Sequence, residues 1–381
     1  MSARGWVLIT GLVTTVFVLM LARLDAPKTT APSATFAATD SQTPGTHAAQ
    51  PVTPAVSISP LTDCDSTDNL LLPSALAEDP TRSDAELQVK WRERHRRAVN
   101  VLDHSDSPRQ RVSALRLQED PASDQQILRL AESVAQQPDD PVLAAELFDL
   151  CNGRLASNAC ARFDTPSMLI RADPDNGHTW FRLAVHYANS SDDDATLDAL
   201  QRVATAPVYD SGVPQMLSQI ELDLRSADSS MSYLERFFSA VGGIAKGGPT
   251  GYSPLFSQCK ALSTNSERWR SACTQAAKRV AADRSTTMQS VLGLSLQAAV
   301  EKAVGQPEKS ALTMARTEAV YAVGRQQHAL EADRLLANDP KVLEQYIDAW
   351  LIDGELAAQT QLVATVEAAI ERGDLRRCRQ N

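Results

Sequence analysis

The sequence is poor in aromatic residues and has no excess of positive charge. Aromatic residues fill 5 % of the 381 positions, while alanine and leucine dominate the 43 % that are hydrophobic. This balance favours closely packed helices over sheets, in which aromatic and β-branched residues are enriched. Because the net charge is -10, the chain as a whole repels phosphate backbones, and we expect no nucleic-acid partner.

Motifs that indicate an enzyme are also missing. The sequence has no H-E-x-x-H, no G-x-S-x-G and no S-x-x-K with a matching partner motif. His178 and His186 lie eight residues apart on one predicted helix, a spacing too wide for a shared metal ion, so we expect them to be exposed or partly packed. We therefore predict no catalytic residues, no metal site and no cofactor.

The N-terminal part of the chain separates into an apolar run and a polar linker. An uncharged stretch from Gly5 to Ala22 is long enough to cross a membrane. Residues 1–25 are thus expected to be an uncleaved transmembrane anchor or, alternatively, a cleaved signal peptide, although the sequence before Pro27 is a poor cleavage site. Residues 26–75, rich in Pro, Thr and Ala, are expected to form a disordered linker.

Helical periodicity begins at Ser83, and residues 76–381 are predicted to form one α-helical repeat domain. Pro138-Asp139-Asp140 and Pro174-Asp175-Asn176 lie 36 residues apart and place Leu147 in the register of Leu183, which indicates a repeat. A weaker third copy begins at Asp339-Pro340. The glycine-rich stretch 242–251 is interpreted as a loop between helices.

The segment from Asp173 to Pro207 predicts one helical hairpin with two apolar faces. It resembles a tetratricopeptide repeat, whose pattern W-x2-L-G-x2-Y, A-x3-F and P is matched in spacing by Trp180, Leu183, Ala184, Tyr187, Leu200 and Pro207. The resemblance implies stacked antiparallel helices with a concave face for peptides or proteins. The whole chain is also similar to membrane-anchored, cysteine-containing helical proteins of bacterial genomes.

Six cysteines form two close pairs and one distant pair. Cys151 with Cys160 and Cys259 with Cys273 are expected to be disulfides if the compartment is oxidising; the alternative is buried free thiols. Each bridge would close a short loop and contribute roughly 2–3 kcal/mol. Cys64 and Cys378 can pair only if the two ends of the domain meet.

Together these features predict an all-α chain of stacked antiparallel helical hairpins after an anchor and a linker. We expect a single-pass inner-membrane protein whose helical domain lies in the periplasm and binds a protein or peptide partner. A cell-envelope hydrolase with its site in a cleft between helices, and a purely structural spacer, are the alternatives.

Overall fold

The structure is a computed structural model that describes residues 84–153, 158–246, 251–323 and 339–372, together with 332, 335 and 336. The chain divides into two units, of which the larger, residues 72–367, contains nearly all of the described residues and is treated by itself. The predicted anchor and linker, and also Cys64 and Cys378, lie outside the described residues. Within the described ranges, no helix has the length and apolar character needed to cross a membrane.

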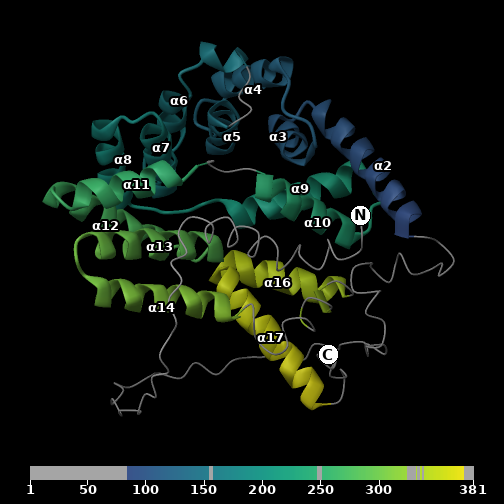
Figure 1. Ribbon diagram of the computed structural model, residues 1–381. Helices are drawn as coiled ribbons and strands as arrows, with labels where there is room; N and C mark the ends of the chain where they lie inside the picture. Colours follow the sequence, from purple (N-terminus) through teal and green to yellow (C-terminus); the bar gives the residue numbers. More distant parts are fainter. Residues whose placement is uncertain are drawn as a thin grey trace. The chain divides into compact units, whose positions relative to one another are not determined.

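The described residues form an all-helical array, as the composition predicted, with one isolated parallel bridge between Asn176 and Val208 and no strand (Figure 1). The first helices are α2 (Asp84–Asp103), α3 (Pro108–Leu117), α4 (Asp124–Gln136), α5 (Pro141–Asn152), the 3-10 helix η3 (Asn158–Arg162), α6 (Thr165–Ala172), α7 (Gly177–Asn189) and α8 (Asp193–Thr205). They are followed by α9 (Val213–Ala227), α10 (Tyr233–Lys246), α11 (Ser253–Ser263), α12 (Glu267–Ala281), α13 (Thr287–Ala303), α14 (Pro307–Val323), α16 (Pro340–Asp353) and α17 (Glu355–Glu371).

Short polar side chains set the first residues of many helices. Ser123 and Gln126 form a reciprocal capping box at the start of α4. At the predicted repeat starts, Asp140, Asn176 and Asp339 accept hydrogen bonds from backbone N–H groups of α5, α7 and α16. Each cap satisfies donors that would otherwise lack a partner, and is worth about 1 kcal/mol. The Pro-Asp pattern therefore marks helix starts in the described chain.

The hairpin predicted between Asp173 and Pro207 is present as α7 and α8. Leu183, Ala184 and Leu200 are fully buried between the two helices, and the Arg202 guanidinium lies 4.4 Å from the centre of the Trp180 ring. Tyr187 is half-buried, and Pro207 is exposed at the end of the hairpin. This packing is continuous with α5 and with α11, α12 and α13 in one hydrophobic core.

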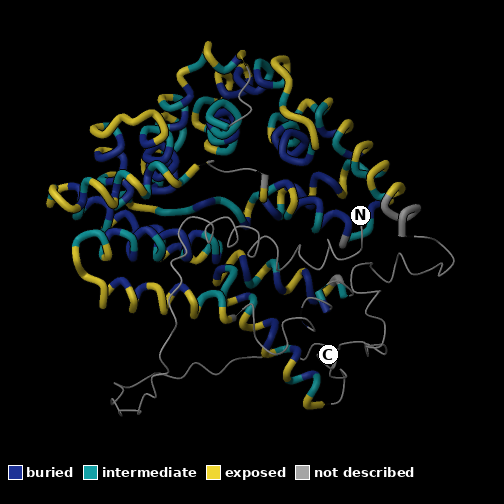
Figure 2. Tube along the Cα trace, in the orientation of Figure 1, coloured by how far each residue is buried: buried dark blue, intermediate teal, exposed yellow. Residues whose placement is uncertain are grey.

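A second hydrophobic core joins α3, α4 and α5. Leu143 and Leu147 of α5 belong to it, whereas Ala144 and Phe148 of the same helix belong to the core around α7. Figure 2 shows the buried residues on the sides of these helices that face their neighbours. Helix α5 is thus buried on two sides and lies between the two cores.

Two parts of the sequence interpretation need correction. The stretch 242–251 is not a loop throughout, because α10 continues through Gly242 and Gly243 to Lys246. Gly243 lies close to the backbone of Arg116 in α3, where a small residue suits the helix contact. The short helix α6 was not predicted, although Asp164 caps it and a proline stands in its first turn.

Candidate functional site

Both cysteine pairs predicted from the sequence are joined in the structure. Cys151 and Cys160 form a disulfide across nine residues with a Cα–Cα distance of 5.3 Å, and Cys259 and Cys273 form one across 14 residues at 5.9 Å. Both distances are normal for a disulfide. The first bridge fixes the C-terminal end of α5 to η3, and the second fixes α11 to α12 inside the main core.

Four charged side chains are buried together where α3, α5 and α7 meet. Arg116 Nε lies 2.5 Å from Glu146 Oε2, and Arg116 Nη2 lies 3.6 Å from Asp149 Oδ2. Arg182 Nη2 approaches the same Asp149 oxygen at 3.5 Å. Because buried charges are costly unless they are paired, two cations and two carboxylates at one place form a balanced set.

The carboxylate of Asp149 is the least satisfied member of this set. Its side chain is 6 % exposed, and neither of its oxygens accepts a hydrogen bond from the described residues. Its separations from the two guanidinium groups exceed the 2.7–2.9 Å of a charge-assisted hydrogen bond. Both oxygens are also closed to solvent, so the carboxylate lies behind the protein surface, where its charge faces the two guanidinium groups.

Asp149 lines a small open pocket between α5 and α7. The empty space at this site is about 310 Å³ when the open solvent in front of it is included. Its walls are Phe148, Asp149, Asn152, Arg182, Val185, His186 and Asn189. Its residues come from the C-terminal half of α5 and from the middle and C-terminal end of α7.

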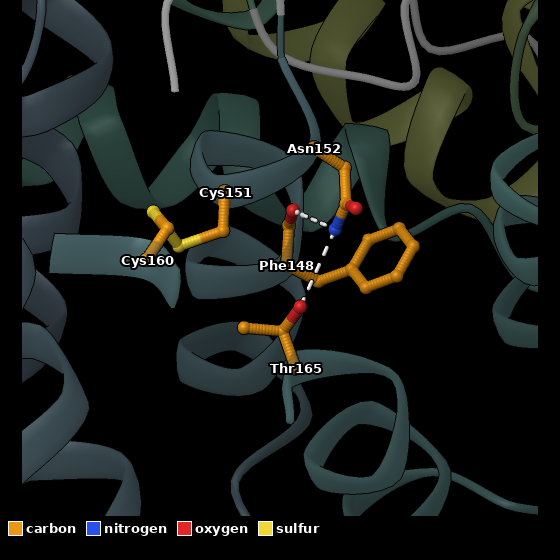
Figure 3. The surroundings of a disulfide bond; sticks show 5 residues. All are labelled: Phe148, Cys151, Asn152, Cys160 and Thr165. Carbon is orange, nitrogen blue, oxygen red and sulfur yellow. Dashed lines mark hydrogen bonds between the residues drawn. A yellow bond between two sulfur atoms is a disulfide. The ribbon is translucent and has the colours of Figure 1, made fainter. Parts of the chain in front are cut away.

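Hydrogen bonds within the protein fix the orientations of the two asparagine side chains of the pocket. In Figure 3, the amide nitrogen of Asn152 donates to Phe148 O at 2.7 Å and to Thr165 Oγ1 at 3.3 Å. The Asn189 amide nitrogen likewise donates to Val185 O at 2.8 Å and to Gly251 O at 3.3 Å. Both side chains thus use their N–H donors on the protein.

The disulfide and the pocket residues occupy opposite sides of the last turn of α5. In Figure 3 the Cys151–Cys160 bridge extends away from the Phe148 ring and the Asn152 amide. The bridge therefore lies beside the pocket without contributing to its lining. Its contribution is to hold the end of the helix that carries Asn152.

Burial controls the charge of the titratable groups around the pocket. Burial raises the pKa of the Glu146 carboxyl, and the neighbouring Asp149 raises it further, although Arg116 acts in the opposite direction. Burial lowers the pKa of His186, and it holds the pKa of His178 well below its usual range, with the Arg182 guanidinium as a further cause. In both cases burial favours the neutral form of the ring.

The fold places the two histidines in different surroundings: His186 is partly packed, as expected, whereas that expectation was wrong for His178, which is buried. His178 is buried with its ring 5.8 Å from the Tyr209 ring, whereas His186 is half-buried and lies edge-on to Phe148 at 5.7 Å. In the ranges that the structure describes, no group of three or more His, Cys, Asp or Glu side chains is placed to hold a metal ion.

Sequence reasoning did not find the pocket or the charged set. One signal was available: Glu146 and Asp149 interrupt an otherwise apolar helix between Val142 and Leu150. Comparison of the chain with protein-family models, curated proteins and solved structures finds no match.

Proposed function

We propose that this chain is a cell-envelope protein, anchored by residues 5–22, whose helical domain binds a protein or peptide through the α5–α7 pocket. The pocket carries the proposal, because its open walls combine polar and apolar side chains in front of a buried set of four charges. We further propose that α5 to α8 are two successive repeats of the tetratricopeptide kind. The shared Pro-Asp starts and the Trp180 hairpin support that reading.

The extracytoplasmic location is supported by the cysteines. Two disulfides that close short loops are typical of proteins that fold in an oxidising compartment. Rapid alkylation of thiols in intact cells, followed by mass measurement of the full chain, tests the location. Blocked alkylation of all four paired cysteines is expected, and full alkylation without a reductant would move the helical domain to the cytoplasm.

The binding role is tested with a matched pair of conservative variants. Asp149→Asn removes the pocket carboxylate, whereas Asp198→Asn removes a carboxylate on the exposed side of α8, where Asp198 is 58 % exposed. Cross-linked membranes from cells that express the full chain should yield the same partner with the wild type and with Asp198→Asn. Recovery should fall at least about tenfold with Asp149→Asn, a change of about 1.4 kcal/mol in binding. Equal recovery from all three chains, or no reproducible partner, would refute this role of the pocket.

A further inference from the structure

The two disulfides differ in how much of the fold surrounds them. Cys259 and Cys273 are both 0 % exposed and belong to the main hydrophobic core, which includes α7, α12 and α13. Cys151 and Cys160 are half-buried, and they pack against the smaller core of α3, α4 and α5 without belonging to its buried set. A reductant therefore meets a closed core at one bridge and a partly open surface at the other.

The elements that carry the cysteines differ in the same way. Cys160 lies in the five-residue 3-10 helix η3, where Ala159 is buried and both residues that follow Cys160 are exposed. Cys259 lies in α11 and is bonded to α12, both of which are longer α-helices packed in the main core. A short 3-10 segment opens at a lower free energy than a packed core. Opening of η3 is enough to free the Cys160 sulfur, whereas the Cys259 sulfur requires opening of the core.

We propose that the Cys151–Cys160 bridge is a site of thiol–disulfide exchange for a dithiol reductant, and that the Cys259–Cys273 bridge is not. One thiolate of the reductant attacks Cys160 Sγ, forms a mixed disulfide and releases Cys151 as a thiolate. The second thiolate of the reductant then attacks its own sulfur in the mixed disulfide and releases Cys160. Two electrons pass to the protein, the protons of the reductant thiols end on the two cysteines, and the reductant becomes a disulfide.

Reduction of this bridge would release η3 from the end of α5. The bridge is a covalent link across the connection from α5 to α6, which the Asn152 amide also spans through its hydrogen bond to Thr165 Oγ1 at 3.3 Å (Figure 3). Without the bridge this connection opens more often, so the backbone N–H groups of residues 158–172 exchange faster with solvent. Because Asn152 also lines the α5–α7 pocket, reduction would loosen one wall of that pocket.

The selectivity is tested on the full chain in a mild non-ionic detergent, with dithiothreitol as the dithiol. Samples are quenched with acid, free thiols are alkylated, and peptide mapping follows the reduction of each bridge with time. Cys151 and Cys160 should become alkylated at least about 100-fold faster than Cys259 and Cys273 in the folded chain. In urea that unfolds the chain, the two rates should agree within about tenfold, because both bridges are then equally open.

Two further measurements test the attacked sulfur and the structural consequence. A thioredoxin whose second active-site cysteine is replaced with serine stops at the mixed disulfide, and peptide mapping should find it on Cys160. Hydrogen exchange in residues 158–172 should become at least about tenfold faster after selective reduction, and that of α12 should stay the same. The double variant Cys151→Ala, Cys160→Ala should show the exchange pattern of the reduced chain, with no further change on addition of dithiothreitol.

A matched variant separates local opening from global unfolding. Cys259→Ala, Cys273→Ala lowers the stability of the whole domain, so any reaction that passes through global unfolding becomes faster in it. The rate at which its Cys151–Cys160 bridge is reduced should stay within about twofold of the wild-type rate. If this variant does not fold, the comparison of the two bridges in the wild-type chain still decides the selectivity.

Four results would overturn the proposal. Equal reduction rates of the two bridges in the folded chain would show that neither is an exchange site. Acceleration in the matched variant would show that reduction needs global unfolding. A mixed disulfide on Cys151 would reverse the order of attack, and unchanged hydrogen exchange in residues 158–172 would show that reduction does not release η3. None of these measurements involves the binding partner, so each outcome leaves the proposed function to its own tests.

Discussion

Replacing Arg116 with methionine removes the cation that neutralises the buried Glu146. Arg116 and Glu146 are each 4 % exposed, and the guanidinium also faces Asp149 at 3.6 Å. Breaking a buried ion pair from one side costs about 3–5 kcal/mol, because the remaining charge stays buried without a partner. We expect Arg116→Met to lower the free energy of unfolding by that amount at pH 8, measured by urea denaturation.

The penalty of Arg116→Met should depend on pH in a defined direction. Burial already raises the pKa of Glu146 above its ordinary value of 4.5, and loss of Arg116 raises it further. A carboxyl with a raised pKa in the folded state binds its proton more tightly there than in the unfolded chain. Its destabilising effect therefore disappears as the pH falls through the folded-state pKa, by at most about 1.4 kcal/mol per pH unit. The variant should be closer to the wild type at pH 5 than at pH 8.

A second substitution separates the lost cation from the orphaned carboxylate. The double variant Arg116→Met, Glu146→Leu removes both charges, and we expect it to be more stable than Arg116→Met alone by at least about 2 kcal/mol. Arg109→Met, in a pair with Asp140 where Arg109 is 53 % exposed, is the control and should change stability by less than about 1 kcal/mol. A cost below about 1 kcal/mol for Arg116→Met, or a double variant less stable than the single one, would refute the reasoning.

Three further predictions concern packing, pH and the second disulfide. Gly293→Ala should destabilise the fold by more than about 3 kcal/mol, because an added Cβ would lie 2.2 Å from Ala281 N in the neighbouring helix. Gly242→Ala, with open space around it, should instead stabilise α10 by up to about 1 kcal/mol. Chemical denaturation of both variants measures the contrast. Burial raises the pKa of the Glu355 carboxyl, which accepts hydrogen bonds from Thr287 N and Oγ1, so folding stability is lost as the pH rises through the folded-state pKa. Glu355→Gln keeps an acceptor without the charge, and its melting temperature relative to the wild type should therefore increase from pH 4 to pH 8. The reverse trend would contradict the assignment. Replacing Cys259 and Cys273 together with alanine should cost about 2–4 kcal/mol by the same denaturation assay, and an unchanged unfolding midpoint would show that the bridge does not stabilise the domain.

The features that were predicted from the sequence are those that depend on neighbouring residues. The helix starts that follow Pro138-Asp139-Asp140 and Pro174-Asp175-Asn176, and the helical hairpin that carries Trp180 and Leu183, follow from local rules of helix formation and helix periodicity. The pairing of Cys259 with Cys273 follows from a separation short enough to be bridged within one helical hairpin.

The features that were not predicted from the sequence depend on contacts between residues that are distant in sequence. Arg116, Glu146 and Arg182 come from three helices, so no local pattern indicates that they meet. The orientation of the Asn152 amide depends on Thr165 in a helix that was itself not predicted. Gly293 is required by the backbone of α12, a contact that helix propensity alone opposes.

The most direct test of the central claim, that the α5–α7 pocket is the binding site, is photo-cross-linking from its rim in living cells. A photoreactive amino acid replaces Asn189, which is exposed at the pocket, or Glu267, whose side chain is 79 % exposed on α12 away from the pocket lining. We predict one discrete cross-linked product from position 189 that disappears when Asp149→Asn is added, and no such product from position 267. The same products from both positions, or a product from position 189 that survives Asp149→Asn, would contradict the claim.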